Sequence, residues 1–269
     1  MAVHEPGVEI RKSFHQSLDE VSHDIVRLAG MVTESLGKAT EALLDGDLRV
    51  AEEIIAGEVA LDALTLDIEE RCYQLLTLQQ PMAIDLRSVV TAARLTAEIQ
   101  RSGGLVVNIM KAARRLYGVE LDPRLRGLIE QLGEQVHRLF RLSIDAYVER
   151  DESLAAAMDD MDDTVDDLHL DFIQTIFEAH GEGVTALQVA VQLALVGRFY
   201  ERIGDHAVNI GERVQYMVTG WLPEHDAAAR QKVREAGDGD PVLLSRDSVG
   251  PGGAEPDVAG RRGPQPGPV

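Results

Sequence analysis

The chain has 269 residues, of which 45% are apolar and only 4% aromatic, and its formal net charge is −20 at pH 7. Nucleic acids and anionic membrane surfaces would repel a chain with this charge, so neither is expected as a partner. A single cysteine, Cys72, rules out a disulfide framework within the chain, and no run approaches the ~20 apolar residues of a membrane span. These features predict a soluble protein of the reducing cytoplasm without membrane insertion.

The first part of the chain has the period of long amphipathic helices. Apolar residues recur every three or four positions over residues 18–43, which predicts a first helix. The break at residues 45–47 ends it, and Asp47 is placed to cap a second helix that continues to the turn at Pro81. A third long helix is predicted over about residues 85–117.

The same pattern then recurs, which indicates an internal duplication. Residues 41–47 match residues 145–151 at an offset of 104, and past the next turn the offset falls to 101, where residues 100–109 overlay residues 201–210. A duplicated three-helix unit is the simplest account. We therefore predict an all-α fold of six long helices, built as two three-helix bundles that pack on each other. The two repeats are expected at residues 8–118 and 122–222.

The last part of the chain has a different composition. Residues 223–269 hold seven of the ten prolines and eight of the 24 glycines, and they show no apolar period. Burial in such a segment cannot offset the entropy of ordering it. We predict a disordered C-terminal tail.

Two pairs of carboxylates in the second repeat are the strongest candidates for a site. Asp162 and Asp166 are four residues apart, as are Glu201 and Asp205, so each pair stacks like charges on one helix face. Two facing helices with such pairs would offer four carboxylates to a hard cation such as Mg, Mn, Ca or iron. The other interpretation is a solvated acidic face that pairs with nearby arginines such as Arg198.

The first repeat departs from this pattern. Glu58 and Asp62 form an equivalent pair, but the positions expected to face them hold Gln100 and Gly104. Glu58 and Asp62 are therefore ranked below the other four carboxylates as metal ligands. Gly103 and Gly104 together predict a close approach of two helices, since adjacent glycines weaken a helix.

Three further features have two interpretations each. His206 lies about 100° around the helix from Asp205, which favours a hydrogen-bonded, partly buried histidine over a ligand. Asn209 shares the face of Asp205, and it would either orient a carboxylate or bond to another helix. The turn at residues 79–87 is either an ordinary helix start, with Asp85 complementing the helix dipole, or a surface that faces a partner.

Together these segments resemble the PhoU family. The resemblance rests on residues 198–214, the turn at 79–87 and the duplicated layout, and more narrowly on residues 162–169 and 199–223, which are similar to actinobacterial members. The likeness covers residues 8–223 in one continuous register and does not include the tail.

The resemblance implies a cytoplasmic regulator of phosphate uptake that holds the phosphate-starvation response off when phosphate is plentiful. It implies an adaptor that acts with the ATPase of the phosphate-specific ABC transporter and with a sensor histidine kinase, and that assembles as a homodimer or larger oligomer. It also implies multinuclear iron or zinc on paired E(D)xxxD motifs, which in this chain are Asp162/Asp166 and Glu201/Asp205.

Other functions remain as alternatives. An accessory subunit of another phosphate permease would need the same bundles. A di-iron bundle needs two Glu-x-x-His motifs on facing helices; Glu20-x-x-His23 and Glu134-x-x-His137 are present, but the duplication places Glu134 opposite Gly30 and not Glu20. No nucleophile triad, P-loop or Rossmann glycine pattern is present, so we expect no enzyme activity.

Overall fold

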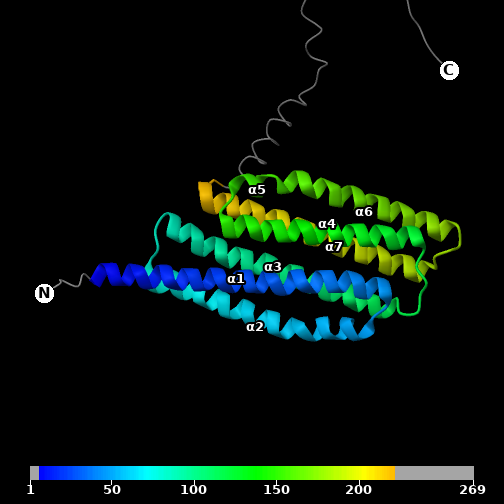
Figure 1. Ribbon diagram of the computed structural model, residues 1–269, viewed down its shortest axis with the longest axis horizontal. Helices are drawn as coiled ribbons and strands as arrows, with labels where there is room; N and C mark the ends of the chain where they lie inside the picture. Colours follow the sequence, from blue (N-terminus) through cyan, green and yellow to red (C-terminus); the bar gives the residue numbers. More distant parts are fainter. Residues whose placement is uncertain (1–5, 222–269) are drawn as a thin grey trace, which may run out of the picture. The chain divides into compact units, whose positions relative to one another are not determined.

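The computed structural model describes residues 6–221. This part of the chain consists of six long helices and one short helix, with no strand (Figure 1). The helices are α1 (Pro6–Asp45), α2 (Leu48–Gln79), α3 (Ile84–Arg115), α4 (Pro123–Glu149), α5 (Glu152–Ala156), α6 (Met158–Gly181) and α7 (Leu187–Thr219). The tail predicted at residues 223–269 lies outside the described residues.

The helices form two bundles related by the duplication. Helices α1, α2 and α3 pack together, as do α4, α6 and α7, and the two bundles meet where α3 contacts α7 and α1 contacts α4. Figure 1 shows the two groups side by side, with their helices running roughly along one axis. The predicted all-α fold of two similar three-helix bundles is confirmed.

One predicted helix is divided in the structure. Asp151 accepts a hydrogen bond from Leu154 N at 3.0 Å and begins α5, and α6 starts only after Ala157. The junction lies directly on α7 at Gly211, where an added Cβ would stand 3.0 Å from the Ala155 carbonyl and 2.9 Å from Met158 Sδ. The break lets the chain approach α7 closely while Met158 stays fully buried.

Capping residues set the helix ends as their types predict. Asp47 accepts hydrogen bonds from Arg49 N at 2.9 Å and Val50 N at 3.1 Å, so its predicted role as the N-cap of α2 is confirmed. Asp122 caps α4, where Pro123 occupies the first turn and has no N–H to leave unpaired.

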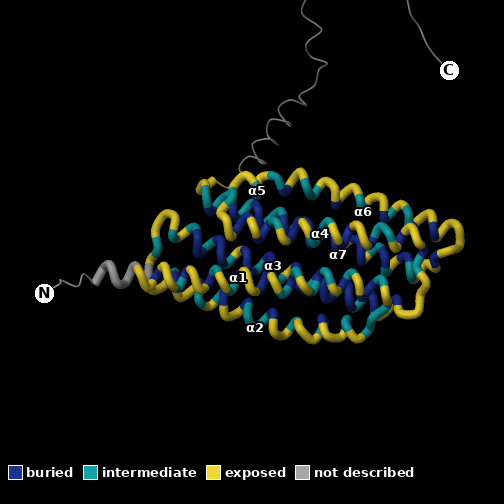
Figure 2. Tube along the Cα trace, in the orientation of Figure 1, coloured by how far each residue is buried: buried dark blue, intermediate teal, exposed yellow. Residues whose placement is uncertain are grey.

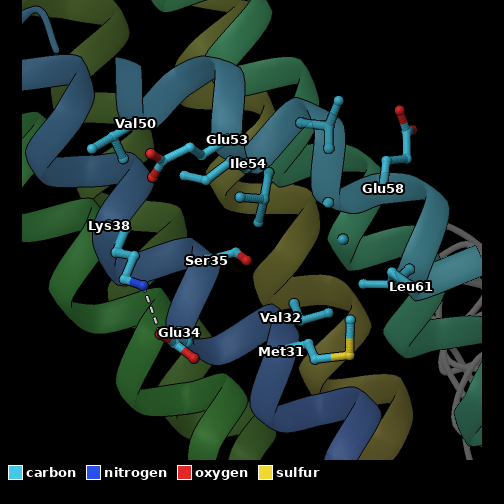
Figure 3. Close-up of a pocket in the computed structure, with 14 residues that line it drawn as sticks. Met31, Val32, Glu34, Ser35, Lys38, Val50, Glu53, Ile54, Glu58 and Leu61 are labelled. Carbon is cyan, nitrogen blue, oxygen red and sulfur yellow. Dashed lines mark hydrogen bonds and ion pairs between the residues drawn. The ribbon is translucent and has the colours of Figure 1, made fainter. Parts of the chain in front are cut away.

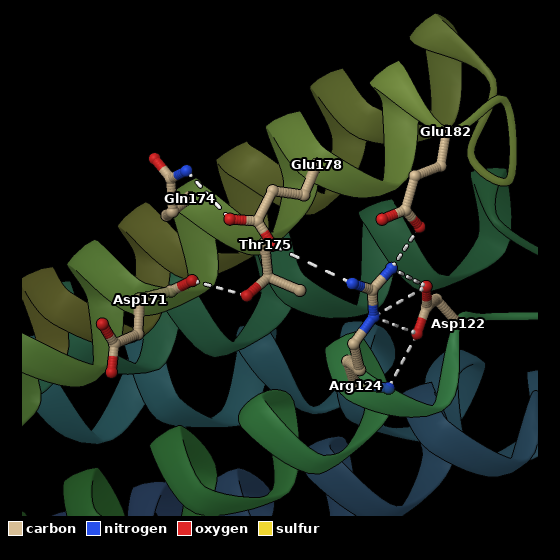
Figure 4. A network of polar contacts seen from close by, with 7 residues as sticks. All are labelled: Asp122, Arg124, Asp171, Gln174, Thr175, Glu178 and Glu182. Carbon is tan, nitrogen blue, oxygen red and sulfur yellow. Dashed lines mark hydrogen bonds and ion pairs between the residues drawn. The ribbon is translucent and has the colours of Figure 1, made fainter.

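Arg124, at the start of α4, ties that end of the helix to the end of α6. Its Nη2 donates to Asp122 Oδ2 at 2.9 Å and to Glu182 Oε2 at 2.7 Å, and Glu178 lies within 3.9 Å (Figure 4). The guanidinium fork can serve several carboxylates because its donors point in fixed, divergent directions.

The core lies along the inward faces of the helices (Figure 2). Its apolar residues recur every three or four positions along each helix, as predicted. Helix α3 contributes to the core from the first bundle and α7 from the second. Tyr200 of α7 is fully buried, and its hydroxyl bonds to Thr40 Oγ1 of α1 at 2.8 Å. The hydroxyl needs such a partner because an unpaired buried polar group costs free energy. Gly133 makes room for this contact, since a Cβ there would lie 2.5 Å from Thr40 Oγ1.

A second polar pair joins the bundles. His206 Nδ1 of α7 lies 2.7 Å from Glu98 Oε2 of α3, and Arg101 bonds to the other oxygen of Glu98. Burial would raise the pKa of the Glu98 carboxyl, but the His206 and Arg101 bonds outweigh it and hold the pKa below its usual value. The prediction of a hydrogen-bonded, buried His206 is confirmed.

Candidate functional site

The four second-repeat carboxylates lie on the packed helices α6 and α7, where Asp166 is exposed and the other three are partly buried. Asp162 and Asp166 are on α6, and Glu201 and Asp205 are on α7. Gly204 lets the two helices approach, because a Cβ there would stand 2.5 Å from Asp162 Oδ1. The carboxylate of Asp162 therefore lies against the α7 backbone, at the residue next to Asp205.

Two oxygens of this set are buried and lack a partner. Asp162 Oδ1 and Glu201 Oε2 have no hydrogen bond to any described residue, whereas Glu201 Oε1 accepts one from Arg198. The Arg198–Glu201 pair agrees with the solvated-face interpretation for one oxygen only. An unpaired buried carboxylate oxygen is costly, by about 1–3 kcal/mol or more.

The pKa of Asp162 also indicates a carboxylate without enough partners. Burial is the largest cause, and the negative charges of Asp166 and Asp205 add to it, so that together they raise the pKa of the Asp162 carboxyl to about 7. A carboxyl in this state is stabilised by a proton or by a cation. The pKa also shows that carboxylates from both helices act on one another.

The residues fit a metal ion by donor type and by their unpartnered atoms. Carboxylate oxygens suit Mg, Mn, Ca or iron, and the buried oxygens have no competing donor within residues 6–221. In the described part of the chain, however, no three His, Cys, Asp or Glu side chains are grouped closely enough to hold one ion. The donors line the seam without converging on a single point.

The equivalent seam of the first repeat is already satisfied by protein partners. Gln100 Nε2 donates to Asp62 Oδ1 at 3.0 Å, and Lys111 Nζ lies 4.0 Å from Glu58. These contacts favour a structural role for Glu58 and Asp62. Gly103 meets the expectation of close packing, since a Cβ there would lie 2.8 Å from Leu61 Cδ1, whereas a Cβ at Gly104 would meet nothing within 4 Å.

A groove of about 240 Å³ opens beside this first seam and is lined by α1, α2 and α3 (Figure 3). Its floor is apolar, with Val32, Ile54 and Leu61, and Glu58 lies on its rim. Lys38, which also lines it, is bonded to Glu34 at 2.6 Å. The lysine at this groove is therefore already paired with a carboxylate of the protein. In the second seam, by contrast, Asp162 Oδ1 and Glu201 Oε2 have no partner among the described residues.

The turn before α3 combines a structural contact with an exposed apolar surface. Arg87 Nε donates to Met217 O at 3.4 Å, at the end of α7, where a cation complements the helix dipole. Gln80 and Ala83 have positive φ of 45° and 51°, and Met82 is 80% exposed. Asp85 lies in the first turn of α3, as the helix-start interpretation expects, and the exposed Met82 side chain leaves the partner-facing interpretation open.

Sequence reasoning missed two residues of the seam. His169, on the same face of α6 as Asp162 and Asp166, has a buried Nε2 without a hydrogen-bond partner among the described residues. Gly204 was not singled out, although it sets the distance between the helices. Comparison of the repeats could have found the histidine, because Thr65 stands at its position in the first repeat.

No helix of the described residues has the length and apolar character needed to cross a membrane.

Comparison with known proteins gives one consistent family. The chain matches the family described as "PhoU domain" twice, at residues 25–113 and at residues 129–214. The first match falls on α1–α3 and the second on α4–α7. "Phosphate-specific transport system accessory protein PhoU homolog 1" of Mycobacterium tuberculosis H37Rv is 34% identical over 218 residues, which are 81% of this chain and 98% of that protein. Homolog 2 of the same strain is 33% identical over 216 residues, 80% of this chain and 100% of that protein.

Two solved structures share the fold. The crystal structure of PhoU from Pseudomonas aeruginosa has a TM-score of 0.74 at 27% identity and covers 77% of this chain and 100% of that one. The crystal structure of the phosphate transport system regulatory protein PhoU from Streptococcus pneumoniae has a TM-score of 0.72 at 26% identity, and covers 78% of this chain and 98% of that one.

Proposed function

The chain belongs to the PhoU family, and we propose that it is a regulatory accessory protein of a phosphate transport system. The observation that carries this proposal is that both bundles match the PhoU domain. In addition, the chain is 34% identical to a mycobacterial accessory protein, and the match covers 98% of that protein. In this role the protein limits phosphate uptake and keeps the phosphate-starvation response off when phosphate is abundant.

The finer proposal is an adaptor in the cytoplasm that contacts both the transporter ATPase and a sensor histidine kinase. An adaptor needs more than one surface, and the duplication supplies two similar ones. Leu66 and Tyr73 on α2 are 66% and 58% exposed, and their equivalents at the 104 offset, Leu170 and Phe177 on α6, are 66% and 68% exposed. Exposed apolar side chains at matching positions suit protein contacts. A homodimer would use one of these faces or the turn at Met82.

A bound metal is part of the proposal, with Asp162, Asp166, Glu201 and Asp205 as ligands. Its support is the two buried carboxylate oxygens without partners and the raised pKa of Asp162. Iron or zinc, singly or as a multinuclear centre, or Mg or Mn, would neutralise the carboxylates and join α6 to α7 when bound. We propose no catalytic role for the chain, since its sequence holds no nucleophile triad or nucleotide-binding motif.

The alternative is an accessory subunit of another phosphate permease with no role in the starvation response. Both functions use the same bundles, and two measurements on one strain separate them: phosphate uptake, and the activity of a starvation-induced promoter. A regulator changes both quantities, whereas a permease subunit changes uptake alone.

The test is a deletion strain of the source organism, cleared of any second copy of the gene and grown with abundant phosphate. A starvation reporter such as secreted phosphatase is expected to be high in the deletion strain and to return to its low level when the gene is restored. A reporter that stays low in the deletion strain while phosphate uptake changes would contradict the regulatory role and support the permease subunit.

A further inference from the structure

The two central helices expose charges of one sign only, although the chain has a net charge of −20. Every exposed charged residue of α3 and α7 is an arginine, because the acidic residues of both helices are buried or partly buried. The exposed arginines are Arg94, Arg101, Arg114 and Arg115 on α3, and Arg198 and Arg202 on α7. The helices that flank them are different, since α2 exposes Glu70 and α6 exposes Asp163, among other acidic residues. This segregation of charge makes α3 and α7 a surface that favours anionic groups.

The packing of α3 on α7 brings arginines of the two repeats together. Hydrogen bonds between the helices show that they are antiparallel and set their register, with Arg87, Thr91 and Glu98 of α3 bonded to Met217, Arg213 and His206 of α7. Arg101 lies three residues after Glu98, and Arg202 lies four residues before His206, so the two arginines are at the same level of the two helices. The repeat offset of 101 relates Arg101 to Arg202. Both arginines therefore lie at the local twofold axis of the duplication.

The arginines occupy the middle of a longer surface. Arg94 lies two turns before Arg101 on one face of α3, and Arg198 lies one turn before Arg202 on α7. These four residues span roughly 18 Å along the helix axes. Exposed aliphatic side chains continue the same faces toward the helix starts: Leu86 on α3, and Leu187, Val191 and Leu195 on α7. The four arginines and these aliphatic residues together are called the arginine strip below.

Two of the four arginines have no acidic partner within the described part of the protein. Arg101 and Arg198 are each paired with a glutamate of their own helix, whereas Arg94 and Arg202 make no ion pair with any described residue. Water can solvate an exposed guanidinium, so a missing partner alone would mean little. Its significance comes from the aliphatic residues beside it and from the lack of any exposed acid on the same two helices.

The charge and the width of the strip select the kind of partner. Carboxylates bind guanidinium groups through paired hydrogen bonds, and the aliphatic ends suit apolar side chains. A single helix, about 10 Å across, can lie on α3 and α7 with its side chains over these two helices. A membrane surface or a nucleic acid duplex is wider, and it would also meet the exposed acids of α2 and α6.

We infer that α3 and α7 dock an acidic amphipathic helix of a partner protein, with about three turns of that helix over the four arginines. Its acidic side chains bind the guanidinium groups, and apolar side chains at its ends pack on the aliphatic residues of the strip. The inference rests on the proposed accessory function, because it specifies the chemistry of the partner through which that function is exerted.

The test replaces the two unpaired arginines in the full-length chain. Arg94→Glu/Arg202→Glu reverses charges in the strip, whereas Arg138→Glu/Arg141→Glu reverses two exposed arginines of α4 and gives the same net charge. The probe is a fluorescent synthetic helix of about 20 residues, composed of Glu, Ala and Leu with the leucines on one face. We expect the strip variant to bind the probe about 10-fold more weakly than wild type, because each reversal replaces an attraction by a repulsion. The α4 variant is expected to bind it as wild type does, and circular dichroism checks that all these chains are folded.

Several outcomes of this titration would overturn the inference. Wild type that does not bind the probe, or an equal loss of affinity in the two variants, would show that the strip does not recognise an acidic helix. Wild type that prefers phosphatidylserine vesicles to the probe, with the same loss in the strip variant, would assign the strip to a membrane surface instead.

Reporter activity in the deletion strain separates this inference from the proposed function. The unchanged gene and the α4 variant are expected to return the starvation reporter to its low level, and the strip variant is expected to leave it high. A strip variant that lowers the reporter as well as the unchanged gene does would overturn the docking surface and leave the proposed function intact. An unchanged gene that fails to lower the reporter would overturn the proposed function, whereas the titration would still report on the strip.

Discussion

The seams α2–α3 and α6–α7 occupy equivalent places in the two bundles, yet they treat polar groups in opposite ways. In the first seam, Asp62 bonds to Gln100 and Thr65 bonds to its own helix. In the second seam, Asp162 Oδ1 and His169 Nε2 are buried with no partner among the described residues. Both seams use a glycine for close approach, Gly103 against Leu61 and Gly204 against Asp162.

This difference indicates that the two repeats have divided their roles. A seam whose polar groups are paired contributes to stability without outside help, whereas unpaired buried donors cost stability until a ligand satisfies them. Proteins retain such costs mainly at functional sites. We therefore propose that the first bundle serves as the scaffold and that the second holds the site.

The largest effect on stability is expected when a first-repeat residue is placed in the second seam. Gly197→Thr introduces a Cβ that would stand 2.7 Å from Cδ1 of Phe172, a ring that is fully buried in the core. We expect the free energy of unfolding to fall by about 3 kcal/mol in urea denaturation. The reverse exchange, Thr96→Gly, is expected to cost about 1–2 kcal/mol through helix propensity and a lost buried methyl group. A smaller loss for Gly197→Thr than for Thr96→Gly would show that the seams are interchangeable.

The contribution of Glu98, a buried carboxylate with partners, to the free energy of unfolding should fall as the pH is lowered. The folded pKa of Glu98 is lowered, so its stabilising contribution is present above the ordinary glutamate pKa and is lost as pH falls through the folded value. Glu98→Gln is expected to lower stability by about 1–2 kcal/mol at pH 7 and by less at pH 3, because the charged partner of His206 is lost. The measurement is urea denaturation at both pH values, and an equal loss at both would contradict the account.

In the metal-free protein, Asp162 should lower the free energy of unfolding as the pH rises, which is the opposite of the effect of Glu98. Its folded pKa is raised to about 7, so its ionised form destabilises the fold as pH rises from the ordinary aspartate value through 7. Asp162→Asn is expected to raise the free energy of unfolding by about 1 kcal/mol at pH 8, a figure reduced from the full shift because the side chain is only partly buried, and to change it little at pH 4. Urea denaturation with chelator present measures both values, and a loss of stability at pH 8 would mean that the ionised carboxylate already has a partner.

The smallest effect on stability is expected at the second-seam glycine. Gly204→Ala places a Cβ 2.5 Å from Asp162 Oδ1, the end of a side chain that can turn away, and alanine recovers about 1 kcal/mol of helix propensity. We expect the free energy of unfolding to change by less than about 1 kcal/mol, while metal affinity falls because Asp162 is displaced. Gly103→Ala is the matched control, since it presses on Leu61 and no proposed ligand. Equal metal affinities for these two variants would argue against Asp162 as a ligand.

Most of the fold could be predicted from the sequence, because the helical period and the offsets of 104 and 101 are local and repeated signals. The split of α5 from α6 could not be predicted. It depends on the close packing of the Ala155 carbonyl against Gly211, two residues that are far apart in the chain.

The site could be predicted only in part. The spacing of Asp162/Asp166 and Glu201/Asp205 places each pair on one face, but it does not show which oxygens lose their partners across the seam. His169 was missed because a lone histidine is usually satisfied within the core. Its importance follows from the absence of a partner for Nε2 among residues 6–221, which only the packing of α6 on α7 reveals.

Metal content after equilibrium dialysis of the full-length chain against Zn²⁺ tests most directly whether the second seam binds a metal ion and the first does not. Glu201→Gln/Asp205→Asn is expected to lose the bound zinc of wild type, with helicity unchanged, and Glu58→Gln/Asp62→Asn is expected to retain it. Equal loss in the two double variants, or loss only in the first-repeat variant, would contradict the division of roles between the seams.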